Sequence, residues 1–99
     1  MPKVIFTIQY ELEKNKEEEY IRIINELKNL LKVDGLEDYT VFRVKGKPNH
    51  FQEQYTFNSE EAFEAFDDEN DERINILINQ LSDLTIDHST KYLTLSEIT

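Results

Sequence analysis

The chain has 99 residues, with 21 Asp and Glu against 11 Lys and Arg, which gives a formal net charge of −10. This acidic excess disfavours nucleic-acid binding, which needs clustered cations, and the lack of Cys excludes disulfides, thiol catalysis and thiolate metal sites. No stretch approaches the roughly 18 apolar residues of a membrane span, and the polar Gln9 follows too soon for a signal peptide. We therefore expect one cytoplasmic domain over residues 1–99, with no membrane partner.

The first half of the chain predicts a strand, a helix and a second strand. Residues 3–11 alternate between two faces. One of these faces carries Val4, Phe6, Ile8 and Tyr10. Asn15 is placed to cap a helix that runs to about Lys32 and repeats its apolar residues at three- and four-residue spacing. Gly35 predicts the helix stop, because glycine adopts a positive φ without a Cβ clash, and residues 39–45 predict the next strand.

The second half predicts a hairpin, two helices and a last strand. Residues 46–49 have turn chemistry and lead into a third strand over residues 50–57. Residues 58–61 are a capping signature for a short helix. The inward side chains of this helix are expected to be Ala62, Phe63, Ala65 and Phe66. A third helix is expected from about Asp71, with a final strand from His88 to about Ile98. The inward stripe of the third helix is expected to be Ile74, Leu77, Ile78, Leu81 and Leu84.

This order, β-α-β-β-α(α)-β, is typical of the α+β class and of the ferredoxin-like split βαβ arrangement. In it a four-stranded antiparallel sheet is covered by helices on one face. The other face also carries large side chains, and a partner sheet would cover them. We therefore expect two copies to pair as a homodimer whose joined sheets form an α+β barrel.

Two features of the sequence suggest metal binding only at first sight. Residues 67–72 begin like a calcium loop, but Glu72 and Ile78 stand where such a loop needs Gly and a bidentate Glu. We expect this acidic run to cap the third helix instead. His50 and His88 have no second His at i+2 or i+4, so no metal site is predicted. His50 remains a candidate catalytic residue because it adjoins the aromatic third strand.

Aromatic side chains are the strongest candidates for a binding site. A flat apolar ligand between sheet and helices would meet these rings, with tyrosine hydroxyls and Glu53 as its few polar contacts. The candidate ligand-binding residues are Tyr10, Phe42, Phe51, Glu53, Phe57, Phe63, Phe66 and Tyr92. The same side chains also suit a core and a dimer interface. The sequence has no catalytic Ser-His-Asp order, phosphate loop or dinucleotide fingerprint, so no cofactor is predicted.

Two stretches carry a resemblance to a known family. They are Pro-Asn-His-Phe at 48–51 and Tyr-Thr-Phe-Asn-Ser-Glu-Glu-Ala-Phe at 55–63. The pattern resembles the dimeric α+β barrel superfamily, and most closely its antibiotic-biosynthesis-monooxygenase-like domains. The resemblance implies a homodimer with one pocket per subunit that binds or oxidises a small quinol-like aromatic molecule without metal or flavin.

The sequence departs from this family at two positions that carry its chemistry. The family uses an Asn near the end of the first strand and a Trp or His in the helix after the third strand. Here Ile8 or Gln9 and Phe66 stand at those positions. Tyr10 or Tyr55 then remains as a proton donor, and His50 and Tyr55 are the candidate catalytic residues. A noncatalytic ligand-binding or protein-interaction module of the same fold stays open as the alternative.

Overall fold

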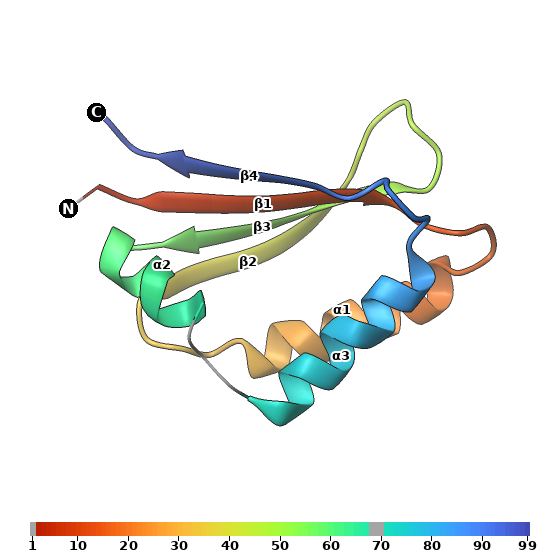
Figure 1. Cartoon of the computed structure of the whole chain (residues 1–99), viewed down its shortest axis with the longest axis horizontal. Helices are drawn as coiled ribbons and strands as arrows, with labels where there is room; N and C mark the ends of the chain where they lie inside the picture. The colour runs from red at the N-terminus through yellow and green to blue at the C-terminus, as the bar shows by residue number, and fades with distance from the viewer. Residues whose placement is uncertain (1, 68–70) are drawn as a thin grey trace.

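The computed structural model describes residues 2–67 and 71–99, which form one sheet and three helices (Figure 1). In chain order the elements are β1 (Val4–Glu11), α1 (Glu17–Leu30), β2 (Leu36–Arg43), β3 (His50–Phe57), α2 (Glu60–Asp67), α3 (Glu72–Leu84) and β4 (Lys91–Ser96). The antiparallel strands are ordered β2-β3-β1-β4, and all three helices lie against the same face of the sheet. The expected ferredoxin-like arrangement is confirmed.

The core lies between this covered face of the sheet and the helices. Strand register brings Phe6 opposite Tyr55, and Tyr10 opposite Phe51, on the covered face. The helices bury an apolar stripe against them, as the three- and four-residue spacing predicts. The buried helical side chains are Tyr20, Ile23, Ile24 and Leu27 of α1 and Ile74, Leu77, Leu81 and Leu84 of α3.

Two helix starts confirm the predicted caps and one does not. The backbone N–H of Ala62 donates to Ser59 Oγ at 3.1 Å, and the N–H of Ile74 donates to Asp71 Oδ1 at 3.0 Å. The expected cap at Asn15 is wrong, because Asn15 has a φ of 65° and lies in the turn before the helix. Lys16 is the N-cap residue of α1, and its side chain makes no capping hydrogen bond. Residues 68–70 of the acidic run lie outside the described part of the chain.

Several boundaries and facings also differ from expectation. Strand β2 begins at Leu36 rather than at residue 39, because Leu36 already pairs with Phe57, and the register shifts between Leu36 and Asp38. Strand β4 begins at Lys91, since His88 has a φ of 66° in the preceding turn. Ala65 is exposed, and Ile78 is 43% exposed because α3 packs against α1 and leaves space beside the sheet.

The uncovered face of the sheet keeps several large apolar side chains. Phe42, Leu93 and Leu95 are 47%, 56% and 46% exposed. Register places Leu95 opposite Ile5 and Leu93 opposite Thr7, so these groups continue across the strands β4 and β1. In the described part of the chain, no helix has the length and apolar character that a membrane crossing requires.

Candidate functional site

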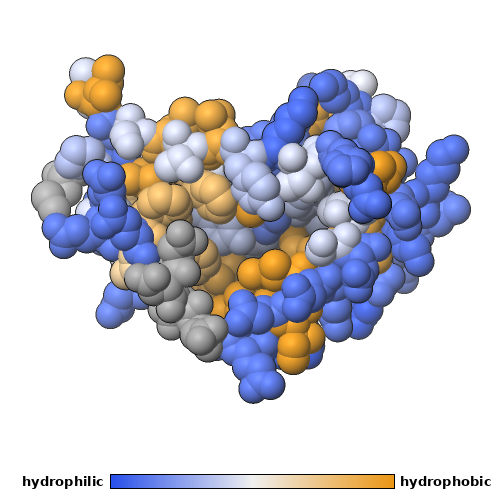
Figure 2. All heavy atoms as spheres, viewed as in Figure 1, coloured by the Kyte–Doolittle hydropathy of each residue, from blue (hydrophilic) through white to orange (hydrophobic). Residues whose placement is uncertain are grey.

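A cavity of about 230 Å³ lies between α3 and the strands β1, β3 and β4. Figure 2 shows apolar side chains gathered where the sheet faces the helices, around this hollow region. The wall combines apolar and aromatic groups with a few polar ones. Its lining includes Ile8, Tyr10, Glu53, Tyr55, Ile78, Leu81 and Tyr92, together with the neutral polar groups of Asn79, Ser82, Thr85 and Thr90.

A larger hollow of about 540 Å³ lies at the other end of the sheet, beside α2. Its lining contains no aromatic ring and includes Glu60, Glu61, Glu64 and Glu97. Such a wall offers few apolar groups against which an apolar ligand could pack. Its charged side chains are all glutamates. The smaller cavity is therefore the better candidate, because apolar walls with a few convergent polar groups are typical of small-molecule sites.

Glu53, at the centre of β3, is the polar group around which this site is built. The carboxyl is 3% exposed. Its Oε2 accepts a hydrogen bond from the Tyr10 hydroxyl at 2.8 Å, and its Oε1 accepts from the hydroxyls of Tyr39 at 2.6 Å and Tyr55 at 3.3 Å. The hydroxyls of Tyr10 and Tyr20 lie 2.8 Å apart. We call these five residues, Tyr10, Tyr20, Tyr39, Glu53 and Tyr55, the Glu53 cluster.

Strand pairing explains why these groups meet. Glu53 stands opposite Ile8 of β1 and Val41 of β2, all on the covered face. Tyr10 lies two positions from Ile8 on β1, and Tyr39 lies two positions from Val41 on β2. Both tyrosines are therefore diagonal neighbours of Glu53, at a separation that long side chains can span. Tyr20 reaches the cluster from α1, where it is fully buried.

Burial and hydrogen bonding act on the cluster in opposite directions. Burial raises the pKa of the Glu53 carboxyl, while the hydroxyls of Tyr39, Tyr10 and Tyr55 lower it by favouring the charged form, and burial is the larger effect. Burial also raises the pKa of each tyrosine well above its ordinary value, and the nearby Glu53 charge adds to this effect. The four tyrosines therefore stay protonated across the physiological range.

Phenyl rings extend the site toward α2. The ring of Phe6 lies 6.1 Å from that of Tyr92, in a stacked arrangement, and 5.7 Å from that of Phe63. The ring of Phe66 lies 5.5 Å from Tyr55 and 5.3 Å from Phe57. These contacts hold the Tyr55 and Tyr92 sides of the cavity wall in fixed positions.

The structure brings together most, but not all, of the residues that the sequence predicted. Tyr10, Glu53, Tyr55 and Tyr92 line the cavity. Phe57, Phe63 and Phe66 pack beside it through the ring contacts above. Phe51 lies on the same face but packs elsewhere, with its ring 4.7 Å from that of Tyr20 and the Arg43 guanidinium 5.0 Å from its centre.

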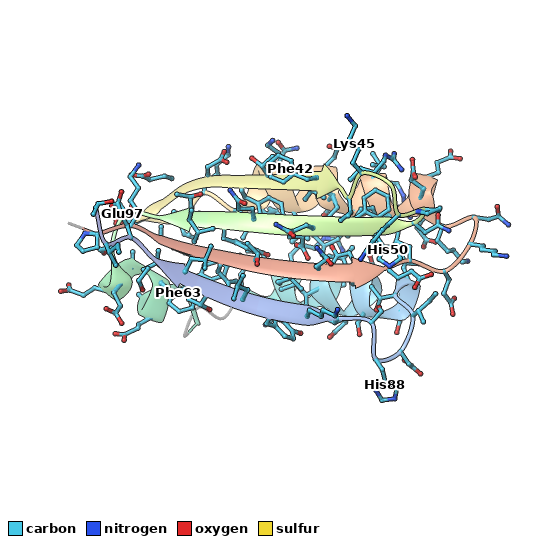
Figure 3. The ribbon with its side chains drawn as sticks, turned by 90° about the horizontal axis from the view of Figure 1, so that it is seen from above. Phe42, Lys45, His50, Phe63, His88 and Glu97 are labelled. Atoms are coloured by element: carbon cyan, nitrogen blue, oxygen red, sulfur yellow. The ribbon has the colours of Figure 1, made fainter. Side chains whose placement is uncertain are left out.

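Phe42 and His50 project from the other face of the sheet. His50 pairs with Glu11 at the start of β3 and lies toward the opposite end of the sheet from Phe63 (Figure 3). Its Nδ1 donates to the Pro48 carbonyl at 2.8 Å, and its Nε2 lies 3.6 Å from Glu11 Oε1. Since His50 and Tyr55 are five positions apart on one strand, they point to opposite faces, and neither His50 nor Phe42 lines the cavity.

Sequence reasoning missed the roles of Tyr20 and Ile78. Tyr20 lies among the residues of α1 that repeat at three- and four-residue spacing, which predicts only a packing role, yet its hydroxyl joins the Glu53 cluster. A buried tyrosine hydroxyl usually has a hydrogen-bond partner. The position of Tyr20 among the apolar residues of its helix could therefore have indicated a buried polar partner. Ile78 was expected in the core and instead lines the cavity. Within residues 2–67 and 71–99, no group of three or more His, Asp or Glu side chains is placed to hold a metal ion.

Comparison with known proteins identifies the fold. No family model matches the chain, and no curated protein matches it in sequence. A conserved protein from Methanosarcina mazei has a TM-score of 0.83 at 16% identity, with 99% of this chain and 95% of that chain covered. A mutant of SnoaB, a cofactor-independent oxygenase from Streptomyces nogalater, has a TM-score of 0.78 at 12% identity, with 98% and 94% covered.

A solved antibiotic biosynthesis monooxygenase is also similar, with a TM-score of 0.77 at 15% identity and all of both chains covered. Sequence identities this low carry information about the fold alone. The chain thus has the fold of the antibiotic-biosynthesis-monooxygenase-like proteins, as the resemblance of residues 48–63 indicated.

Proposed function

We propose that the chain binds a small quinol-like aromatic molecule in the cavity beside Glu53 and oxidises it with molecular oxygen, without metal or flavin. The observation that carries this proposal is the cavity itself, because it combines a buried carboxyl and tyrosines with apolar side chains and a few neutral polar groups in one wall. The fold shared with SnoaB, a cofactor-independent oxygenase, supports the same reading.

The size of the cavity limits the ligand. A cavity of about 150 Å³ lined by apolar side chains is large enough to bind benzene. The cavity here measures about 230 Å³. The described walls therefore have room for a one-ring or two-ring quinol.

The reaction balances with oxygen as the only co-reactant. A quinol and O₂ give a hydroxyquinone and water: both hydroxyls become carbonyls, one ring C–H becomes C–OH, and the second oxygen atom leaves as water. The ring gives up electrons more readily once a hydroxyl proton has been removed. Glu53 at the cavity wall is the proton acceptor in this proposal, and Tyr55 positions its Oε1 through their hydrogen bond. His50 has no part in it, because it lies on the other face.

The experiment compares two substitutions on α3. Ile78 lines the cavity, whereas Ile76 has nearly the same exposure, 41% against 43%, and does not line it. We expect Ile78→Trp to fill the cavity and abolish both ligand binding and oxygen uptake with a naphthalene-diol substrate, while Ile76→Trp retains them. Tyr55→Phe should bind the substrate but turn it over more slowly. Oxygen consumption and product mass would be measured on all four proteins.

A noncatalytic binding module is the second candidate, and one observation favours it. Phe66 stands where the family resemblance places a Trp or His, and here its ring packs against Tyr55 and Phe57. Binding that depends on Ile78 but gives no oxygen uptake would support this module and contradict catalysis. Failure of aromatic ligands to bind would contradict both.

The uncovered face of the sheet supports a homodimer, which is also part of the proposal. Exposed Leu93 and Leu95 lie on the edge strand β4 and exposed Phe42 on the opposite edge strand β2, with the neutral Thr7 and Gln52 as strand partners of Leu93 and Phe42. A second copy offers the same surface, so a two-fold symmetric pairing would cover both at once. It would also cover apolar groups that a single chain leaves in water.

A further inference from the structure

The hydroxyl protons of the Glu53 cluster can be counted against its hydrogen bonds. The four tyrosines supply four protons. Four hydrogen bonds join the cluster: one between Tyr20 and Tyr10, and three onto Glu53 from Tyr10, Tyr39 and Tyr55. With Glu53 ionised, every proton is therefore used inside the cluster. In the described part of the chain, no buried side-chain polar atom lacks a partner.

Acceptor capacity, by contrast, is left over. An ionised carboxylate accepts about four hydrogen bonds, and Glu53 accepts three. The Tyr55 hydroxyl donates to Glu53, and its oxygen has two lone pairs, of which the neighbouring Tyr39 hydroxyl engages at most one. Both groups line the cavity. A ligand group placed against Glu53 therefore meets acceptors without a free donor proton, whereas the donors of Asn79, Ser82, Thr90 and Tyr92 lie on other parts of the wall.

We propose that the Glu53 cluster makes the cavity prefer ligands that donate a hydroxyl hydrogen bond, so that it holds a reduced phenol or quinol more tightly than an oxidised quinone or an aryl ether. A carbonyl or ether oxygen of a ligand could not form a hydrogen bond with the ionised Glu53, because both groups only accept hydrogen bonds. This inference rests on the proposed aromatic ligand and adds the oxidation state that the site prefers. It also gives the oxidised product a physical reason to leave.

Protonation of Glu53 would reverse the balance. The cluster would then hold five protons for the same four hydrogen bonds, and one proton would be free for an acceptor on the ligand. The groups that face Glu53 are Tyr10 from β1, Tyr20 from α1, Tyr39 from β2 and Tyr55 from β3, with the cavity walls adding Tyr92 from β4 and the neutral Asn79 and Ser82 from α3. The preference for donors should therefore weaken as the pH is lowered.

The test uses three unreactive one-ring probes on the unmodified protein: 4-methylphenol, 4-methylanisole and toluene. Their dissociation constants would be measured by NMR titration at pH 8.5 and pH 5. Since a hydrogen bond to a charged group adds about 1.5–3 kcal/mol, the phenol should bind about tenfold tighter or better than the ether at pH 8.5. The ratio should fall toward one at pH 5. The phenol stays neutral at both values, because its pKa is about 10.

A matched variant locates the effect. Glu53→Gln keeps the shape but adds amide donors, so we expect its phenol-to-ether ratio to be near one at both pH values. Equal binding of phenol and ether to the unmodified protein at pH 8.5 would overturn this inference and leave the proposed aromatic site intact. If none of the probes binds, the inference and the proposed site both fall. The comparison on the unmodified protein stands even if the variant does not fold.

Discussion

Glu53 is the residue at which the chain departs most from the usual rules of a core. A carboxyl with 3% exposure loses its hydration, and this loss favours the neutral form. Three tyrosine hydroxyls replace part of that hydration. Because a core of leucines would be simpler to stabilise, so costly a group at a cavity wall is better explained by binding or catalysis than by packing.

The raised pKa of Glu53 makes a prediction about stability. The folded chain holds the proton above the ordinary pKa of 4.5, where the unfolded chain releases it. The free energy of unfolding should therefore receive its largest contribution from Glu53 at low pH and lose it as the pH rises from about 4.5 through the folded-state pKa. In urea titrations from pH 4.5 to 8.5, the stability of the unmodified protein relative to Glu53→Gln should fall steadily.

Glu17 provides a control, because its contribution to the free energy of unfolding should change with pH in the opposite direction to that of Glu53. Arg43 donates two hydrogen bonds to its carboxylate, at 2.7 and 2.8 Å, and these lower the pKa of Glu17. The contribution of Glu17 should therefore be present above pH 4.5 and be lost as the pH falls, with a small size because the pair is exposed. If the stability of the unmodified protein relative to Glu53→Gln stays constant or rises with pH, the result would contradict a raised pKa at Glu53.

Gly35 and Gly46 both need a positive φ, but only Gly35 is also constrained by packing against another element. Gly35, before β2, has a φ of 86°, and Gly46, in the β2–β3 turn, has a φ of 85°. A Cβ at Gly35 would collide with the Cβ of Ala62 on α2, whereas a Cβ at Gly46 would meet nothing within 4 Å. The Gly35 carbonyl also accepts a hydrogen bond from the Asn58 N–H at 2.8 Å, close to where α2 begins. Gly35 is therefore where α2 approaches the sheet.

Alanine substitutions at these two glycines should differ in cost. Both place a Cβ at positive φ, which destabilises by about 1–2 kcal/mol. Gly35→Ala must also move α2, and we expect a further loss of roughly 1–3 kcal/mol in the free energy of unfolding, measured in urea. Equal losses at the two positions would show that α2 gives way easily and that its contact with Gly35 contributes little.

The elements were largely predictable because their signals are local. Strand alternation, the caps at Ser59 and Asp71 and the positive φ of Gly35 each depend on a few neighbouring residues. Asn15 failed as a cap because an Asn also adopts positive φ readily, so the same residue suits a turn. The facing of Ile78 depends on where α3 packs against α1, which a helical period does not contain.

The candidate site was predictable to the extent that it follows a strand. Alternation placed Glu53, Tyr55 and Phe57 on one face, and the structure agrees. The same rule separates His50 from them, although the sequence analysis named both His50 and Tyr55 as candidate catalytic residues. Phe42 was grouped with the ligand contacts by residue type, and strand register puts it on the other face. The convergence of Tyr10, Tyr20 and Tyr39 on one carboxyl is a long-range feature that no local pattern encodes.

At the scale of the whole molecule, the uncovered sheet face favours the pairing of two copies, whereas the net charge opposes it. The face exposes apolar groups that favour pairing, yet each chain carries a formal net charge of −10. Two copies brought together repel one another. The exposed apolar groups have neutral partners, Thr7 opposite Leu93 and Gln52 opposite Phe42, while Lys91 and the Glu11–His50 pair lie at one end of the face, so we expect apolar burial to drive the contact.

A dimer of this kind should become tighter as salt is added. The Debye length falls from about 30 Å at 0.01 M to about 8 Å at 0.15 M, so salt screens the repulsion between the two acidic chains and leaves the apolar contact in place. Native mass spectrometry should find a species with twice the mass of the chain. Sedimentation equilibrium should give a lower dissociation constant for it at 0.15 M NaCl than at 0.01 M.

Substitutions locate the contact on the sheet. Leu95→Glu places a carboxylate on the uncovered face and should yield monomers at both salt concentrations, whereas Ile76→Glu places one on the exposed side of α3 and should leave the dimer unchanged. A dimer that weakens with salt would point to ion pairs across a different surface. A chain that stays monomeric throughout would contradict the barrel and leave the cavity of each single chain, with its Glu53 cluster, as the whole of the site.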